Sequence, residues 1–287
     1  MSVTDRPRFA PDWLALREGA DADARATELL GPLRRRLDAD RSWPGAVLVV
    51  RDLGCGTGSM GRWLVPRLRG PQHWVLHDHD AALLGLAAAR LPRTGADGSR
   101  VTVATRRGDI GRLTAEELSG TGLVTASALL DLLTRAEVDR LAAACAGAGC
   151  PALLALSVAG RVELTPADPL DAAIGGAFND HQRRLDDGRR LLGPDAVAAA
   201  RELFAGRGMT VRTHSSPWRL GGAGDSALTA EWLRGWVGAA REQRPDLAPR
   251  ATAYLRRRLE ACEAGELRVV VHHHDLLALP APVGGPA

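Results

Sequence analysis

The 287-residue chain contains no lysine, so arginine carries all of its positive side-chain charge. Its 37 basic residues stand against 34 Asp and Glu, a formal net charge of only +3. Arginine triplets occur at 34–36 and 256–258, both within amphipathic helical patterns, and we interpret them as solvated helix faces. No aromatic platform accompanies them, so the sequence predicts no nucleic-acid partner.

Aromatic residues make up only 4% of the chain, so Leu, Val and Ala must fill the core. No run of about 18 apolar residues occurs, and we therefore expect no membrane span. The N-terminal segment is polar and lacks the apolar centre of a signal peptide. The four cysteines form no C-x-x-C pair, which favours reduced thiols, a cytoplasmic protein and no metal site.

Short apolar runs alternate with helical patterns along most of the chain. Continuous apolar runs such as 46–50 are typical of parallel strands that are buried on both faces. This alternation predicts an α/β fold with a doubly wound, mostly parallel sheet. The predicted strands are 46–50, 74–76, 101–103, 123–126, 152–156, 209–211 and 267–271.

Helical segments interrupt this alternation at two places. Residues 1–44 carry one apolar helical stripe and are expected to form a helical N-terminal leader, before a ligand-binding domain over 45–287. Two amphipathic helices are expected between the last two strands, and we interpret the insertion at about 214–265 as a helical cap. A further helix is expected after Asp168-Pro169, with an apolar stripe of Ile174, Phe178 and Leu185.

The most informative motif follows the first predicted strand, where Asp52-Leu53-Gly54-Cys55-Gly56-Thr57-Gly58 leads into a helix. Glycines at such a turn let the backbone approach a ligand closely, because no Cβ intervenes. Amides at the start of the following helix favour a carboxylate. The acid Asp52 at the strand end suits the ammonium group of a bound amino acid.

A dinucleotide site is the competing interpretation, because residues 56–61 satisfy G-x-G-x-x-G. A nicotinamide cofactor places its pyrophosphate at this turn, and Asp52 would repel it. The alternative of an NAD(P)-dependent oxidoreductase therefore stays open but is less favoured.

Two further acids follow the next predicted strands. Asp78 ends the second strand, where a carboxylate can accept both ribose hydroxyls, and His79 lies beside it. Asp109 and Ile110 follow the third strand, where Asp109 could accept the adenine amino group while Ile110 packs on the ring. All four are predicted cofactor contacts.

Together these motifs resemble those of class I S-adenosylmethionine (SAM)-dependent methyltransferases, of the bacterial small-molecule type, over about residues 45–160. The resemblance implies a seven-stranded sheet whose last strand is antiparallel, with SAM as the cofactor. It also implies that the glycine loop holds the methionine part, including Cys55, and that Ser127 lies near the sulfonium. One departure is Gly122 before the fourth strand, a position that is often acidic in the family.

The acceptor side is predicted from the helix after the fifth strand, where Asn179 and Arg183 are expected to contact substrate and His181 to act as a base. Asp131 is the second candidate base. A helix N-terminus would lower the pKa of Cys55, yet its place in the glycine loop favours a packing role over nucleophilic catalysis.

The sequence thus predicts methyl transfer from SAM to an O, N or C nucleophile of a small molecule. Besides the oxidoreductase, two alternatives stay open: a non-catalytic protein with a SAM-binding fold, and an enzyme of that fold with another reaction, such as a cyclisation. The oligomeric state is not predicted.

Overall fold

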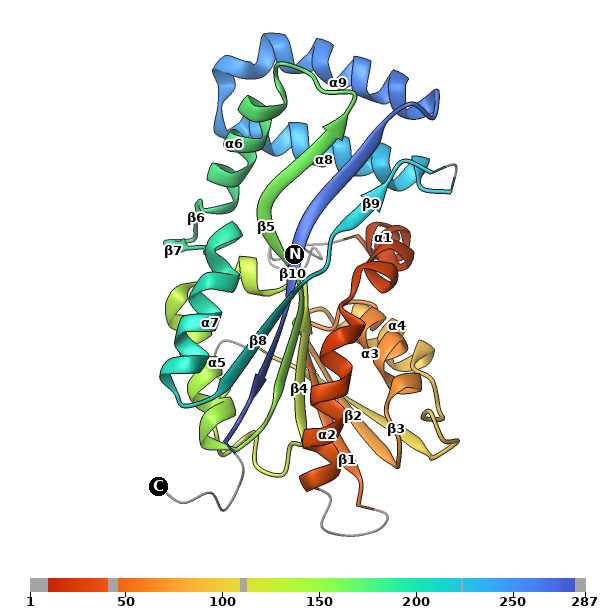
Figure 1. Cartoon of the computed structure of the whole chain (residues 1–287), viewed down its shortest axis with the longest axis vertical. Coiled ribbons are helices and arrows are strands. Elements are labelled where there is room, and N and C mark those ends of the chain that lie inside the picture. Colours follow the sequence, from red (N-terminus) through yellow and green to blue (C-terminus); the bar gives the residue numbers. More distant parts are fainter. Residues whose placement is uncertain (1–9, 41–45, 109–112, 223, 282–287) are drawn as a thin grey trace.

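The computed structural model describes residues 10–40, 46–108, 113–222 and 224–281 (Figure 1). Its centre is a sheet in the order β3-β2-β1-β4-β5-β10-β8, with β9 paired to β10. The strands of this sheet are β1 (Leu48–Leu53), β2 (Gln72–Asp78), β3 (Val101–Arg107), β4 (Leu123–Ser127), β5 (Ala152–Thr165), β8 (Thr210–Ser215), β9 (Trp218–Leu220) and β10 (Arg268–Leu279).

The first five of these strands pair in parallel, whereas β10 pairs antiparallel with both β5 and β8. Central strands are buried on both faces, which explains their continuous apolar sequences. The predicted α/β fold with a mostly parallel sheet and an antiparallel last strand is confirmed, but the sheet has eight described strands instead of the expected seven, because β9 also pairs with β10. β10 lies inside the sheet between β5 and β8, so its antiparallel direction does not place it at an edge.

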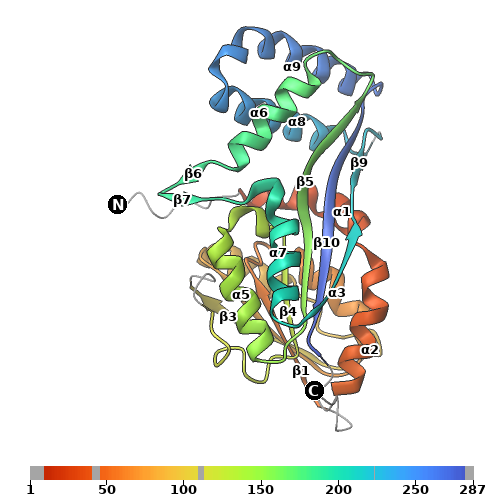
Figure 2. The same ribbon diagram turned by 60° about the vertical axis from the view of Figure 1, so that its left-hand side comes forward.

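Helices cover both faces of the sheet, making three layers (Figure 2). One face carries α2 (Leu30–Asp40), α3 (Ser59–Leu64) and α4 (Ala81–Arg90), and the other carries α5 (Arg135–Gly147) and α7 (Ala196–Gly206). A capping box begins α5, because the side chains of Thr134 and Glu137 accept hydrogen bonds from each other's backbone N–H groups. Single 3₁₀ turns occur at η2 (Thr27–Leu29), η3 (Val65–Arg67), η5 (Leu130–Leu132), η6 (Gly193–Asp195) and η7 (Pro245–Leu247).

The strands β5 and β10 are much longer than their apolar runs predict. They pair antiparallel over their whole length and extend beyond the other strands (Figure 1). Three helices pack around this extension in a separate apolar cluster: α6 (Asp171–Gln182), α8 (Ser226–Gln243) and α9 (Ala248–Glu263). They form a lobe above the carboxyl ends of the parallel strands.

The leader is two helices, not one continuous stripe. The first, α1 (Pro11–Ala24), ends at Arg25, whose extended backbone turns the chain toward η2 and α2. The predicted stripe therefore belongs mainly to α2, whose Leu33 and Leu37 are buried against the sheet. The helix α1 lies beside β9 and α3, near the carboxyl ends of the parallel strands.

Other details also differ from the sequence prediction. Leu185 is not part of a helical stripe: it lies in the short hairpin β6 (Leu185–Asp186) and β7 (Arg189–Arg190), and its side chain is exposed. Strand β9 was not predicted at all. No helix within the described part of the chain combines the length and apolarity that crossing a membrane requires.

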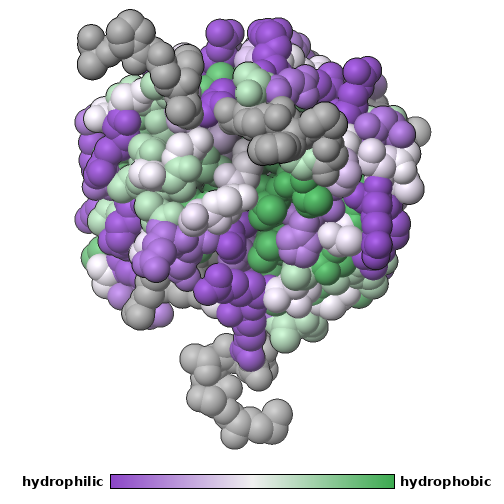
Figure 3. Space-filling model, turned by 90° about the horizontal axis from the view of Figure 1, so that it is seen from below, coloured by the Kyte–Doolittle hydropathy of each residue, from purple (hydrophilic) through white to green (hydrophobic). Residues whose placement is uncertain are grey.

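The end of the molecule opposite the lobe is a mixed surface. Seen from below, hydrophilic and hydrophobic side chains lie side by side there (Figure 3).

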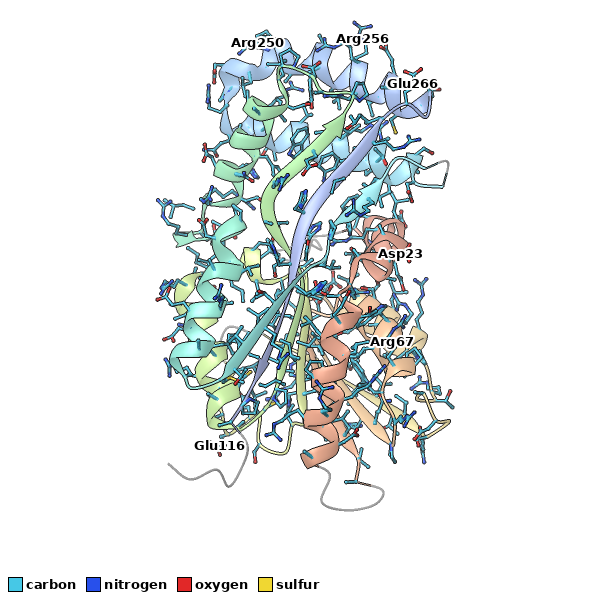
Figure 4. All side chains as sticks on the ribbon, viewed as in Figure 1. Asp23, Arg67, Glu116, Arg250, Arg256 and Glu266 are labelled. Carbon is cyan, nitrogen blue, oxygen red and sulfur yellow. The ribbon has the colours of Figure 1, made fainter. Side chains whose placement is uncertain are left out.

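The charged residues labelled in Figure 4, such as Glu116 and Arg250, lie at both ends of the molecule and project outward from its periphery. The chemistry-bearing residues lie instead between the parallel strands and α1.

Candidate active site

A cavity of about 580 Å³ lies where the glycine loop, α1 and the end of β4 meet. This volume is in the range of a pocket for a small organic ligand. Its position at the carboxyl ends of parallel strands is where open α/β sheets bind ligands. It is lined by residues of the leader (Leu14, Arg17, Asp21), of β1, the glycine loop and α3 (Asp52, Gly54, Cys55, Gly56, Thr57, Ser59, Met60), of the ends of β2 and β3 and of α4 (Asp78, His79, Gly108, Leu83), and of the chain from the end of β4 to α5 (Ser127, Ala128, Leu129, Leu132, Leu133, Glu137), and by Arg189.

The loop between β1 and α3 depends on glycine backbone geometry. Gly54, Gly56 and Gly58 have φ of +59°, +54° and +85°, which side chains other than glycine rarely adopt. A Cβ on Gly58 would lie 3.0 Å from the Cβ of Ala87, so α4 packs directly against the loop. The sequence motif thus marks a real backbone constraint at the cavity wall.

Asp52 is the most deeply buried acid at the cavity. Its Oδ1 accepts a 2.8 Å hydrogen bond from the hydroxyl of Thr125, its register partner on β4. Its Oδ2 has no hydrogen-bond partner among the described residues. Burial raises the pKa of Asp52 to about 7, although Thr125 and Arg25 act in the opposite direction. An unpaired buried carboxylate oxygen beside a cavity needs a donor, and a cationic ligand group would supply one.

Asp78 holds the glycine loop from the neighbouring strand. Its Oδ2 accepts from the backbone N–H of Gly56 at 2.9 Å, and its Oδ1 accepts from that of Asp80 at 3.0 Å. The ring Nδ1 of His79 lies 3.2 Å from Oδ1, and His79 itself is exposed at the cavity mouth. A carboxylate oxygen has two lone pairs, so Asp78 keeps acceptor capacity for a ligand hydroxyl.

Cys55 differs from the sequence expectation in its acidity. The thiol is buried, and desolvation followed by the charges of Asp52 and Asp78 raises its pKa well above the ordinary value. The lowered pKa expected from a helix N-terminus is therefore wrong, because α3 has only six residues and two acids lie close by. This environment disfavours the thiolate and a nucleophilic role.

Three predicted cofactor contacts remain: Asp109, Ile110 and Ser127. Asp109 and Ile110 lie outside the described residues, although Gly108 before them lines the cavity. Ser127 ends β4 and lines the cavity, and its hydroxyl accepts a 3.1 Å hydrogen bond from Nη2 of Arg25. The next residue, Ala128, has φ of 51°, so the chain turns sharply beside the cavity.

The three predicted acceptor-side residues, two in α6 and Arg183 directly after it, do not line the cavity, which corrects the sequence-based placement. Asn179 donates to the carbonyl of Gly160, His181 lies 3.2 Å from Glu242, and Arg183 forms a two-bond ion pair with Asp195. The extension of β5 causes this difference: it carries α6 away from the parallel strands and into the lobe. Polar packing accounts for these side chains without a substrate.

Asp131, the second candidate base, lies closer. It is in η5 between the cavity-lining residues Leu129 and Leu132, without being part of the lining itself. Its Oδ1 has no hydrogen-bond partner among the described residues, and burial raises its pKa. The charge of Arg17, a cavity-lining residue of α1, acts to lower that pKa.

Sequence reasoning assigned no individual residue of α1 to the site. Arg17 pairs with Asp21 at 3.0 Å, and its guanidinium lies 4.9 Å from the ring centroid of Trp218. The indole N–H of Trp218 donates to Asp21 at 3.0 Å. Glu18 accepts two 2.6 Å bonds from Arg62 of α3, which fastens α1 over the glycine loop. The spacing of Arg17 and Asp21 on one helix face was the only signal of this role in the sequence.

Comparisons with known proteins give the following findings. No protein-family model matches the chain, and no curated protein matches it. Among solved structures, the chain is similar to a SAM-dependent methyltransferase from Thiobacillus denitrificans bound to S-adenosylhomocysteine, with 16% identity, 96% of this chain and 100% of that chain covered, and a TM-score of 0.44.

A SAM-dependent methyltransferase from Geobacter sulfurreducens, also with S-adenosylhomocysteine, gives 18% identity, 96% and 99% coverage and a TM-score of 0.41. The ligand-free mycolic acid cyclopropane synthase CmaA1 gives 13% identity, with 94% of this chain and 100% of that chain covered, and a TM-score of 0.45. These similarities are too distant to say anything about a reaction. The mostly parallel α/β fold follows from the strand order and directions of this chain itself.

Proposed function

We propose that the chain transfers a methyl group from SAM to a small-molecule acceptor. One observation carries this proposal: Asp52, with an unpaired buried oxygen, and Asp78, which accepts the Gly56 N–H, line the same cavity beside the glycine loop. Asp52 suits the ammonium group of an amino acid, and Asp78 suits a ribose diol. A ligand that combines an amino acid with a nucleoside satisfies both.

The residues present fit SAM and its product S-adenosylhomocysteine. Asp52 and the loop from Gly54 to Gly58 would hold the methionine part, Asp78 the ribose, and Asp109 with Ile110 the adenine. When bound, SAM supplies a methyl group on a sulfonium, which is already activated toward nucleophiles. The protein then has to align the acceptor and exclude water. The helix α1, which lines one side of the cavity, would shield the reacting groups from solvent.

The acceptor would occupy the part of the cavity that the proposed cofactor-binding residues do not line. Its walls are apolar, made by Leu14 of α1 and by Leu129, Leu132 and Leu133 after β4. Two ion pairs, Arg17 with Asp21 and Arg189 with Glu137, also reach this part. We therefore infer an acceptor with an apolar body and a polar group that replaces or joins one of these pairs.

Asp131 is the base we propose where the acceptor nucleophile carries a proton. Burial raises its pKa, and a carboxylate with a raised pKa accepts a proton more readily near neutral pH. Its unpaired Oδ1 is available for that proton. His181 is no longer proposed for this role, because it lies in the lobe beside Glu242.

The oxidoreductase alternative is less well supported by the site. Asp52 would place a carboxylate close to a pyrophosphate, and no cationic side chain of the loop itself compensates it. Calorimetry with S-adenosylhomocysteine and with NADH separates the two proposals. Binding of S-adenosylhomocysteine supports SAM chemistry, and binding of NADH alone overturns it.

Transfer itself needs a separate experiment. We would incubate the protein with SAM carrying an isotopic label in its methyl group, together with pooled apolar small-molecule acids, phenols and amines. Label recovered in an acceptor, with stoichiometric S-adenosylhomocysteine, supports methyl transfer. S-Adenosylhomocysteine binding with no transfer to any pool favours the non-catalytic alternative.

A further inference from the structure

A buried arginine stands directly behind the cavity wall. Arg25, the residue that ends α1, is only 3% exposed, and its guanidinium lies 5.6 Å from the ring centroid of Trp63. No carboxylate forms an ion pair with it within the described part of the chain, and its Nε and Nη1 have no hydrogen-bond partner there. A buried cation in this situation is costly, so its retention points to a role.

The one nitrogen of Arg25 that has partners is directed at the cavity. Nη2 donates to the hydroxyl oxygen of Ser59 at 3.0 Å and to that of Ser127 at 3.1 Å. Both serines line the cavity, one at the start of α3 and the other at the end of β4. Arg25 thus connects the leader to both walls of the glycine-loop end of the cavity.

This arrangement fixes what the two hydroxyls can do. A serine hydroxyl whose oxygen accepts from a guanidinium still has its own proton to donate. The cation polarises both O–H groups and makes each a stronger donor. Two polarised donors that line one cavity and share one guanidinium nitrogen form a receptor for an anion with two acceptor oxygens, such as a carboxylate.

Acids close to the receptor indicate which carboxylate fits. The nearby carboxylate of Asp21 already accepts hydrogen bonds from Arg17 and Trp218. That of Asp275 already accepts from two backbone N–H groups. Asp52 keeps its open Oδ2 on the same side, since its partner Thr125 is two residues before Ser127 on β4. A zwitterion would bring an ammonium to Asp52 and a carboxylate to the serines together.

We propose that Arg25, acting through Ser59 and Ser127, forms the receptor for the α-carboxylate of the cofactor's amino-acid part. This inference rests on the proposed SAM-binding function. Arg25 is then a positioning residue: it supplies the charge and orients two hydroxyls, while the hydroxyls contact the ligand. Because Arg25 ends α1, cofactor binding would also fix the leader over the cavity.

The test compares two ligands that differ only in this carboxylate. S-Adenosylhomocysteine and its decarboxylated form are titrated by calorimetry into the parent, Arg25→Met, Arg25→Lys and the double variant Ser59→Ala, Ser127→Ala. The matched control is Arg35→Met, which removes an exposed arginine of α2. The parent and the control should prefer S-adenosylhomocysteine by about 10- to 100-fold, the range of hydrogen bonds to a charged group.

Arg25→Met and the double-serine variant should bind both ligands with affinities within about 3-fold of each other, the decarboxylated ligand being little affected, and Arg25→Lys should keep part of the preference. A preference that survives in folded Arg25→Met or in the double-serine variant overturns the inference. So does equal loss of both ligands in a variant that keeps the parent's melting temperature, because a structural role would do that. If Arg25→Met does not fold, Arg25→Lys and the double-serine variant decide. A parent that binds neither ligand refutes the proposed function instead.

Discussion

The backbone N–H of Ala26 donates a 2.9 Å hydrogen bond to Oδ2 of Asp275, a residue 249 positions later in the chain. The other oxygen, Oδ1, accepts from the backbone N–H of Leu156 at 2.8 Å. Leu156 has φ of +56°, so this bond also holds an unusual backbone turn within β5. One buried carboxylate therefore joins the leader, β5 and β10. Its bond to the leader is made at Ala26, the residue that follows Arg25.

Replacing this carboxylate by an amide tests the connection. Asp275→Asn should lower the free energy of unfolding by about 1–3 kcal/mol, because an amide group would face one of the two N–H donors and leave it unsatisfied. It should also weaken S-adenosylhomocysteine binding, since α1 would lose its fixed end. Urea unfolding and calorimetry measure the two effects.

Asp23→Asn is the matched control for this change. Asp23 is an exposed residue of α1 and points away from the sheet (Figure 4). This variant should match the parent in both measurements. Equal stability of Asp275→Asn and the parent would mean that the bond to Ala26 contributes nothing to the leader's position.

Asp52 should make ligand affinity depend on pH. Its pKa is raised to about 7, and only the ionised form attracts an ammonium group. Affinity for S-adenosylhomocysteine should therefore rise from pH 5.5 to pH 8, with release of a proton on binding below pH 7. In Asp52→Asn the affinity should be low and should lose the part of this pH dependence that Asp52 contributes.

The same raised pKa should make the ligand-free protein less stable as the pH rises, whereas it makes ligand binding stronger. A carboxyl group whose folded pKa lies above its unfolded value of about 3.9 favours folding when protonated, and this contribution is lost as pH rises toward 7. Relative to the parent, Asp52→Asn should thus become more stable between pH 4 and pH 8. A constant difference in unfolding free energy across this range would contradict the raised pKa.

Most of the parallel part of the fold could be predicted because β1, β2 and β4 are short, largely apolar and followed by helical patterns, whereas β3 ends in exposed polar residues and no described helix separates it from β4. The capping box of Thr134 and Glu137 and the glycines after β1 are local features, and local features are readable in a sequence. The acids Asp52 and Asp78 were recognisable for the same reason, since each ends a buried strand.

The two helices of the predicted cap, α8 and α9, could be recognised from their amphipathic patterns, but the way the lobe is built could not, because it depends on pairing between distant segments. Beyond Gly160, strand β5 continues with Val162 and Leu164 on one face and charged residues on the other, an alternation that the apolar run before it obscured. Without that extension, α6 was expected at the cavity, and His181 was assigned to the wrong place. Arg25 carried no local signal, because its role depends on serines 34 and 102 positions away.

The glycine loop gives a test of backbone fit. Gly56 has φ of +54°, and a Cβ there would lie 3.2 Å from a methyl group of Leu14. Gly56→Ala should therefore strain the loop, push α1 outward and reduce S-adenosylhomocysteine affinity at least 10-fold. Gly85→Ala is the control, because Gly85 is helical with nothing within 4 Å of its Cβ position, and it should bind normally and gain up to about 1 kcal/mol of stability. Equal affinities for the two variants would show that the ligand does not contact this loop.

Asp78 gives the most specific test of the cofactor's orientation. If its carboxylate accepts a ribose hydroxyl, Asp78→Asn should lose about 1.5–3 kcal/mol of S-adenosylhomocysteine binding, or about 10- to 150-fold in affinity. Part of that loss could come from the loop itself, because Oδ2 also accepts the N–H of Gly56.

A double-mutant cycle separates these two contributions. The 2′-deoxy form of S-adenosylhomocysteine should bind the parent more weakly, and Asp78→Asn should discriminate much less between the two ligands. Asp80→Asn is the control: Asp80 caps α4 and does not line the cavity, and asparagine is an equally good cap, so this variant should keep the parent's discrimination. If Asp78→Asn loses affinity but discriminates between the ligands as the parent does, Asp78 only holds the loop, and the ribose must bind elsewhere in the cavity.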